Sequence, residues 1–220
     1  MKKMFIAIVV LAIIFVGMII YKNTMVGTKN NISIEEVQKI EEYIEKIYMW
    51  KEVTGEALPD FEDINNANDL WTWEAVKQNL EKYTITYDEI QQKAKEIFGN
   101  NFTKQFPIGG NETIIYNSET GEYYATGMGL DEEEDTFFIK NIEKNKEGYV
   151  VEIVEYLEDY SEESSVIIRN LQEEEIGRVS ISDSETKMQE IVKNNIERFS
   201  KKKVYLKTEE NNLVVQKVEK

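Results

Sequence analysis

The chain has 220 residues and a formal net charge of −16, and it contains neither cysteine nor histidine. Disulfide bonds, thiol chemistry, zinc sites built on thiolate or imidazole, and nucleophilic catalysis that relies on histidine are therefore excluded for this chain alone. An enzyme of this composition would have to work with carboxylates, lysine, tyrosine or a cation held by oxygen.

The first feature along the chain is an uncharged stretch over residues 4–21, made mostly of Ile, Val, Phe, Leu, Met and Ala. As a helix it would extend roughly 27 Å, close to the thickness of the apolar core of a bilayer. Secretory signals have shorter apolar regions of about 7–15 residues and a small-residue cleavage site, and no convincing site follows here. The sequence therefore predicts a retained membrane anchor over residues 1–22, with a cleaved signal as the alternative.

The orientation of this anchor is predicted from the very short tail that precedes it. The charge bias is small, because Lys2 and Lys3 lie on one side and Lys22 and Lys29 on the other. An anchor preceded by a tail of only three residues most simply leaves that tail inside the cell and exports the long domain. We therefore expect a cytoplasmic amino terminus and a single-pass protein in the cell membrane, with the long domain outside; a domain inside the cell is the alternative.

A polar linker is predicted over residues 23–32, followed by one extracytoplasmic domain over residues 33–220. All 42 acidic residues follow the anchor, against 23 of the 26 basic ones, so the soluble part has a net charge of −19. Such a domain repels nucleic acids and anionic lipids. The expected partners are the lipid bilayer, through residues 4–21, and an unidentified protein or envelope component.

The first predicted helix of the domain begins at a capping box formed by Ser33 and Glu36. Apolar residues three and four apart continue from there to Trp50 and give one buried stripe. Residues 52–68 include a glycine and a proline, and we predict a loop there.

Two further helices are predicted before the pattern changes. One is capped by Asp69 and buries a stripe made of Leu70, Trp73, Val76 and Leu80. The other is capped by Thr86 together with Glu89 and ends at Gly99.

The apolar period becomes alternating after Gly109 and Gly110, and a sub-boundary is predicted near residues 107–111. Residues 113–126 predict a hairpin that turns at Gly121. Further strands are predicted at 136–143, 149–158, 164–170 and 176–182. Both faces of the 149–158 strand are partly apolar, so this strand is expected to be central in its sheet.

A last helix is predicted from a cap formed by Ser182 and Glu185, and its buried stripe contains Met188, Ile191, Val192, Ile196 and Phe199. Lys201–Lys203 are expected at its carboxyl end, where positive charge complements the helix dipole. Residues 204–219 predict a closing hairpin. The fold class is thus α+β: an N-terminal transmembrane helix, three helices, an antiparallel sheet of hairpins, one further helix and a C-terminal hairpin.

Aromatic side chains are the first candidates for a ligand or partner contact. Trp71 and Trp73 project about 200° apart on a helix, which places Trp71 with Glu74 and Gln78 on the polar face. We interpret Trp71 as packing against another element, with ligand or partner contact as the alternative. The remaining candidates lie in the predicted hairpin and are Tyr116, Tyr123 and Tyr124.

Two acidic stretches have the composition of calcium sites but not the pattern. Residues 130–135 place carboxylates side by side with no glycine for a binding loop, and we interpret them as a solvated loop. Residues 63–74 have acids or amides at positions one, three, seven and twelve of a calcium loop, yet the fifth position is alanine and the sixth is asparagine. No metal, cofactor or catalytic residue is predicted.

The composition, the anchor and the missing catalytic residue types favour a non-catalytic binding or interaction module. The alternative is a carboxylate-based glycan or cell-wall hydrolase, which the aromatic and acidic residues would suit. A concave pocket that brings two acids beside Trp71 or the three tyrosines would favour the enzyme. A convex surface with one apolar patch would favour the binding module.

Overall fold

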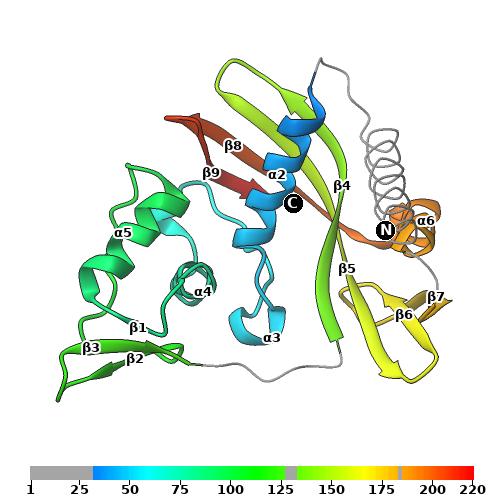
Figure 1. Ribbon diagram of the computed structural model, residues 1–220. Helices are drawn as coiled ribbons and strands as arrows, with labels where there is room; N and C mark the ends of the chain where they lie inside the picture. The colour runs from blue at the N-terminus through cyan, green and yellow to red at the C-terminus, as the bar shows by residue number, and fades with distance from the viewer. Residues whose placement is uncertain (1–31, 127–132, 183–184) are drawn as a thin grey trace, which may run out of the picture.

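The computed structural model describes residues 32–126, 133–182 and 185–220, and it shows an α+β fold with antiparallel sheets (Figure 1). The predicted anchor over residues 4–21 lies outside this part of the chain. Among the described residues, no helix is both long and apolar enough to cross a membrane. The anchor therefore remains a prediction from the sequence.

The first and third predicted helices of the domain are confirmed with their caps. Helix α2 spans Ile34–Ile47, and in its capping box the Ser33 hydroxyl accepts from the Glu36 amide while the Glu36 carboxylate accepts from the Ser33 amide. Helix α5 spans Tyr87–Phe98, is capped in the same way by Thr86 and Glu89, and ends at Gly99 with a φ of 90°. Helix α2 ends before Trp50 because the chain becomes extended at Tyr48.

The segment between these two helices differs from the prediction in two ways. The predicted loop contains helix α3, Lys51–Thr54, and the 3-10 helix η1, Ile64–Asn66. Helix α4 spans Asp69–Gln78, but its cap is Asn68, whose side-chain oxygen accepts from the Trp71 amide at 3.1 Å. Asp69 is instead the first helical residue, where its negative charge favours the positive end of the helix dipole.

A small sheet of three antiparallel strands lies below α4 and α5 in Figure 1. Strands β1, Thr84–Ile85, and β2, Ile114–Asn117, lie on either side of β3, Glu122–Ala125. The predicted hairpin is therefore confirmed. Gly121 turns it with a φ of 74°, a conformation that glycine adopts without strain.

The large sheet has β5 at its centre, as predicted. Strand β5, Gly148–Glu162, pairs with β4, Glu133–Lys144, and with β6, Ser165–Arg169. It also pairs with β8, Ser200–Glu209. Strand β7, Glu175–Ser180, pairs with β6, and strand β9, Asn212–Glu219, pairs with β8. Glu210 and Asn211 form the two-residue turn of the closing β8–β9 hairpin, both with positive φ.

The last helix is shorter than the sequence predicts. Helix α6 spans Glu185–Asn194 and is followed by the 3-10 helix η2, Ile196–Arg198; residues 183 and 184 lie outside the described part. The prediction for Lys201–Lys203 is wrong, because all three lie in strand β8. The side chain of Lys202 is only 3% exposed, and its ammonium contacts the Leu58 carbonyl and pairs with Asp60 at 3.2 Å.

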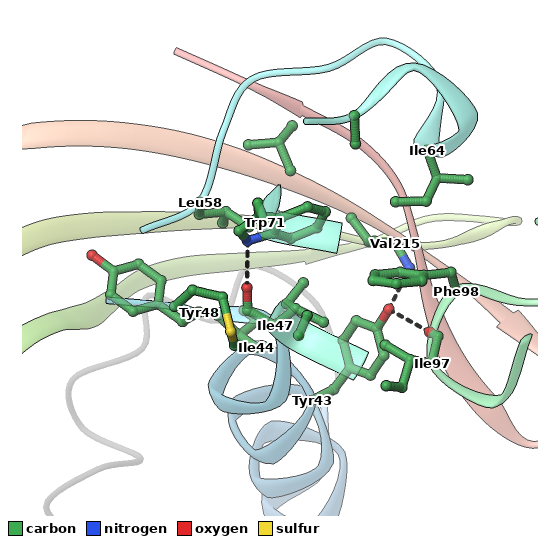
Figure 2. Close-up of a cluster of buried hydrophobic side chains, with 14 of the residues drawn as sticks. Tyr43, Ile44, Ile47, Tyr48, Leu58, Ile64, Trp71, Ile97, Phe98 and Val215 are labelled. Carbon is green, nitrogen blue, oxygen red and sulfur yellow. Dashed lines mark hydrogen bonds between the residues drawn. The ribbon is translucent and has the colours of Figure 1, made fainter. Parts of the chain in front are cut away.

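The core consists of two hydrophobic clusters. The larger one joins α2, α4 and α5 to the inner faces of both sheets, and Figure 2 shows the part around Trp71. Residues before and after the predicted sub-boundary contribute to it, for example Phe106 and Tyr123, whose rings are 5.5 Å apart. The smaller cluster lies beneath α6 and includes Phe138, Val154 and Ile168. Strand β5 is apolar on both faces because it contributes to both clusters.

Candidate functional site

Trp71 lies in the core and does not reach the surface of the described domain. Its side chain is 0% exposed, its ring contacts Phe61 and Phe98, and its indole nitrogen donates to the Ile47 carbonyl at 2.9 Å (Figure 2). This burial agrees with the packing interpretation. Trp73 is also buried, against Phe102 and Phe106.

The prediction that Glu74 lies on a polar face of helix α4 is wrong. The Glu74 side chain is 0% exposed and that of Lys77 is 7% exposed, and the two form an ion pair at 2.7 Å. Their approach is not aligned as a hydrogen bond, and neither group has another hydrogen-bond partner. The reason is tertiary, since α4 packs against α2, α3 and α5 and so is covered on several sides.

The three candidate tyrosines do not form one group. Side chains alternate along a strand, so neighbours point to opposite faces of the small sheet. Tyr116 and Tyr123 pair across β2 and β3 with ring centroids 5.0 Å apart, and Tyr123 is buried against the core. Tyr124 pairs with Ile115 in the register of the opposite face. Among the three tyrosines of the hairpin, Tyr124 alone belongs to the outward face.

The outward face of the small sheet carries a patch that we call the tyrosine platform, defined by Tyr83, Ile115 and Tyr124. Tyr83 is 71% exposed and Ile115 is 52% exposed. The rings of Tyr83 and Tyr124 meet edge to face at 6.1 Å. Sequence reasoning missed Tyr83, because it precedes a strand of two residues that no alternating pattern reveals.

The edge of the platform is acidic. Glu119 lies in the β2–β3 turn and lines the same shallow hollow as the platform residues. Glu122 lies two residues before Tyr124 on β3 and accepts a hydrogen bond from its hydroxyl at 3.4 Å. The platform is thus an open, shallow apolar surface with negative charge along one side.

A deeper hollow lies between α2, β4, β5 and α6, and we call it the acidic groove. Its volume is about 570 Å³. In Figure 1, α2 and α6 lie on either side of the β4–β5 pair. The groove is lined by five acidic side chains, which are Glu41, Glu45, Glu134, Asp135 and Glu158. No lysine or arginine is found among the described residues of its lining.

Both ends of α2 are fixed to this part of the sheet. At its start, the Glu36 carboxylate accepts from the Lys144 ammonium at 2.5 Å and from the Tyr149 hydroxyl at 2.8 Å. The bond to Lys144 is the main cause that lowers the pKa of Glu36 to about 2. At its end, the Tyr48 hydroxyl donates to the Thr136 carbonyl at 3.1 Å. These contacts hold the α2 wall of the groove beside β4.

Asp135 is an acid of the groove whose carboxylate is partly buried. One carboxylate oxygen accepts from the Lys51 amide at 2.6 Å, and the other is buried without a hydrogen-bond partner. Burial raises the pKa of Asp135. Behind the lining, burial also raises the pKa of Glu155, which lies 3.5 Å from the Tyr48 hydroxyl. The pKa of Tyr48 is raised, first by burial and then by these two negative charges.

The two acidic stretches do not form metal sites in the described residues. No group of three or more acidic side chains is arranged there to hold a metal ion. Residues 130–132 lie outside the described part, whereas residues 133–135 belong to strand β4 and not to a loop. Asp63 caps η1, and Glu74 is buried against Lys77, so the calcium-loop register of residues 63–74 is not formed.

Comparison with known proteins gives no relative from which a function could be transferred. No family model matches the chain, and no match is found among curated proteins or among solved structures. The tyrosine platform and the acidic groove are therefore the two features from which a function is inferred.

Proposed function

We propose that this chain is a membrane-anchored extracytoplasmic module that binds a protein partner and performs no catalysis. The observation that carries the proposal is the tyrosine platform. Large apolar side chains that are exposed together on a small domain mark contact surfaces, whereas single exposed ones need no explanation. The apolar stretch at residues 4–21 supports the membrane attachment.

The charge of the chain restricts the chemistry of this partner. Glu119 and Glu122 border the platform, and the whole chain has a net charge of −16. Like charge opposes the approach of a second copy or of an anionic polymer, and opposite charge accelerates the approach of a basic surface. The partner we propose is a protein with an apolar contact centre and a basic rim.

A glycan hydrolase is the second candidate, and the acidic groove is the observation that favours it. Asp135 and Glu155 both have raised pKa values, as a general acid in such enzymes requires. However, only Asp135 lines the groove, and Glu155 lies behind Tyr48. This candidate predicts that purified chain releases reducing ends from cell-wall polysaccharide and that Asp135→Asn abolishes the release.

Site-specific photo-crosslinking tests the binding module. A photoreactive phenylalanine replaces Tyr83 in the full chain in intact cells. The matched control carries it at Ile181, which is 57% exposed and follows strand β7 of the large sheet. We expect a protein adduct of discrete mass from position 83 and none from position 181. Equal adducts from both positions, or none from position 83, would refute the proposal.

A pair of charge variants in the same background tests the chemistry of the partner. Ile115 points outward beside Tyr124, so its replacement changes the platform without opening the core. Ile115→Lys would repel a basic rim and should abolish the adduct, whereas Ile115→Glu should retain more of it. The reverse order would show that the partner is acidic and would overturn the charge argument.

A further inference from the structure

We propose that the tyrosine platform binds a proline-rich segment in the polyproline II conformation, with lysine or arginine beside the prolines. The inference rests on the proposed function and names the chemistry of the partner at the same site. Its first support is the shape of the platform. The ring planes of Tyr83 and Tyr124 meet at 65°, so the two rings form a corner and not a flat wall. Proline-rich segments dock on aromatic-lined surfaces, because their preformed conformation loses little entropy on binding.

The second observation concerns hydrogen-bond donors on the same face. A polyproline II segment has no internal hydrogen bonds, so its carbonyl groups need donors from a partner or from water. Asn117 lies two residues after Ile115 on β2, so both side chains point outward, and both line the same hollow. The Asn117 oxygen accepts from the Glu119 amide at 2.9 Å. Its NH₂ group and the Tyr83 hydroxyl have no partner among the described residues and are left to donate.

The third observation is that the acids beside the platform lack a counter-charge. Neither Glu119 nor Glu122 forms an ion pair within the part of the chain that the structure describes, although Glu122 accepts from the Tyr124 hydroxyl at 3.4 Å. Glu119 is exposed in the β2–β3 turn. Opposite charges at the rim of an interface fix the register of the partner and speed its association. A lysine or arginine next to the prolines would supply that charge.

Other conformations of a bound segment fit these features less well. An added strand needs a free sheet edge, but β3 is central and the outer edge of β2 is met by Gly110, which bridges to Ile115, and by Asn111, whose amide donates to the Ile114 carbonyl at 2.9 Å. A bound helix presents apolar anchors over two turns and needs a longer apolar strip than three side chains. A polyproline II segment has about three residues per turn, so one side of it can pack on the rings while the next carries the basic residues.

Fluorescence anisotropy of labelled peptides tests this assignment with the full chain in a polyoxyethylene detergent. The probe is a short peptide that alternates two prolines with one lysine. One control peptide has alanine in place of proline and keeps the charge, and the other has glutamine in place of lysine and keeps the prolines. We expect saturable binding of the probe and about tenfold weaker binding of each control. Excess N-acetylglucosamine should not displace the probe.

Two pairs of variants locate the binding on the platform. Tyr83→Ala removes a ring that is 71% exposed, so the fold is retained, and it should weaken binding about tenfold; Ile181→Ala, at a position 57% exposed beyond β7, should not change it. Glu119→Lys should abolish binding of the lysine peptide. Glu147→Lys makes the same charge change in the exposed β4–β5 turn and should leave binding nearly unchanged.

Four results would overturn the inference: no saturable binding of the probe, equal binding of the alanine peptide, displacement by the sugar, or equal effects of the two lysine variants. The crosslinking experiment at Tyr83 separates this inference from the proposed function. A discrete protein adduct from position 83 without binding of the proline peptide would overturn this inference alone. The absence of both would overturn the proposed function as well.

Discussion

The buried ion pair of helix α4 allows a sharp test of how this domain is held together. Glu74 and Lys77 lie one turn apart at 2.7 Å, with side-chain exposures of 0% and 7%. Solvent therefore does not screen them, and removing one partner leaves the other charge buried at a cost of about 3–5 kcal/mol. Lys77 is near the surface, so its long side chain can reach water when Glu74 is lost. The shorter side chain of Glu74 cannot reach water in this way when Lys77 is lost.

We therefore expect Lys77→Met to lower the free energy of unfolding by about 5 kcal/mol and Glu74→Leu to lower it by about 3 kcal/mol. The double variant should be within about 1 kcal/mol of the parent in stability, or more stable than the parent. The assay is urea denaturation of the full chain in detergent, followed by the fluorescence of the buried Trp71 and Trp73. A double variant that loses as much as the sum of the two single variants would show that the charges act independently and would refute this reasoning.

Three further predictions concern single side chains. Tyr43→Phe should cost about 1–3 kcal/mol in the same assay, because the hydroxyl donates to the Ile97 carbonyl at 2.9 Å and accepts from the Val215 amide at 2.7 Å (Figure 2). Lys202→Met should cost about 3 kcal/mol and speed proteolysis of the loop over residues 55–63, which the Lys202 ammonium holds to β8. Asp135→Asn should raise the free energy of unfolding at pH 7, and this gain should vanish as the pH falls towards 4. A carboxyl group whose pKa is raised in the folded state stabilises the fold only below its ordinary pKa, and this contribution is lost as the pH rises. A gain at pH 7 that persists unchanged at pH 4 would contradict this assignment.

Local signals in the sequence predict much of the fold. The capping boxes at Ser33 and Thr86, the glycine at position 121 and the two-faced apolar pattern of β5 each determine an element through contacts close in sequence. The errors occur where tertiary contacts decide. Lys202 looks like the end of a helix, but it is buried in β8 because its ammonium satisfies the Leu58 carbonyl and the charge of Asp60.

The candidate site could be predicted only in part for the same reason. Alternation along a strand separates Tyr124 from Tyr123, and that much is visible in the sequence once the hairpin is recognised. The contribution of Tyr83 to the platform depends on a two-residue strand pairing with β3. The acidic groove joins α2 to β4, β5 and α6, which are far apart along the chain, so no local motif marks it.

The central claim is that the domain lies outside the cell and stays attached to the membrane by residues 4–21. The chain has no cysteine, so a single one introduced as Ser118→Cys in the exposed β2–β3 turn gives one reactive position. An impermeant maleimide applied to intact cells should label the full-length chain in the membrane fraction. Labelling only after lysis, or a shortened chain free in the medium that begins after Tyr21, would contradict it.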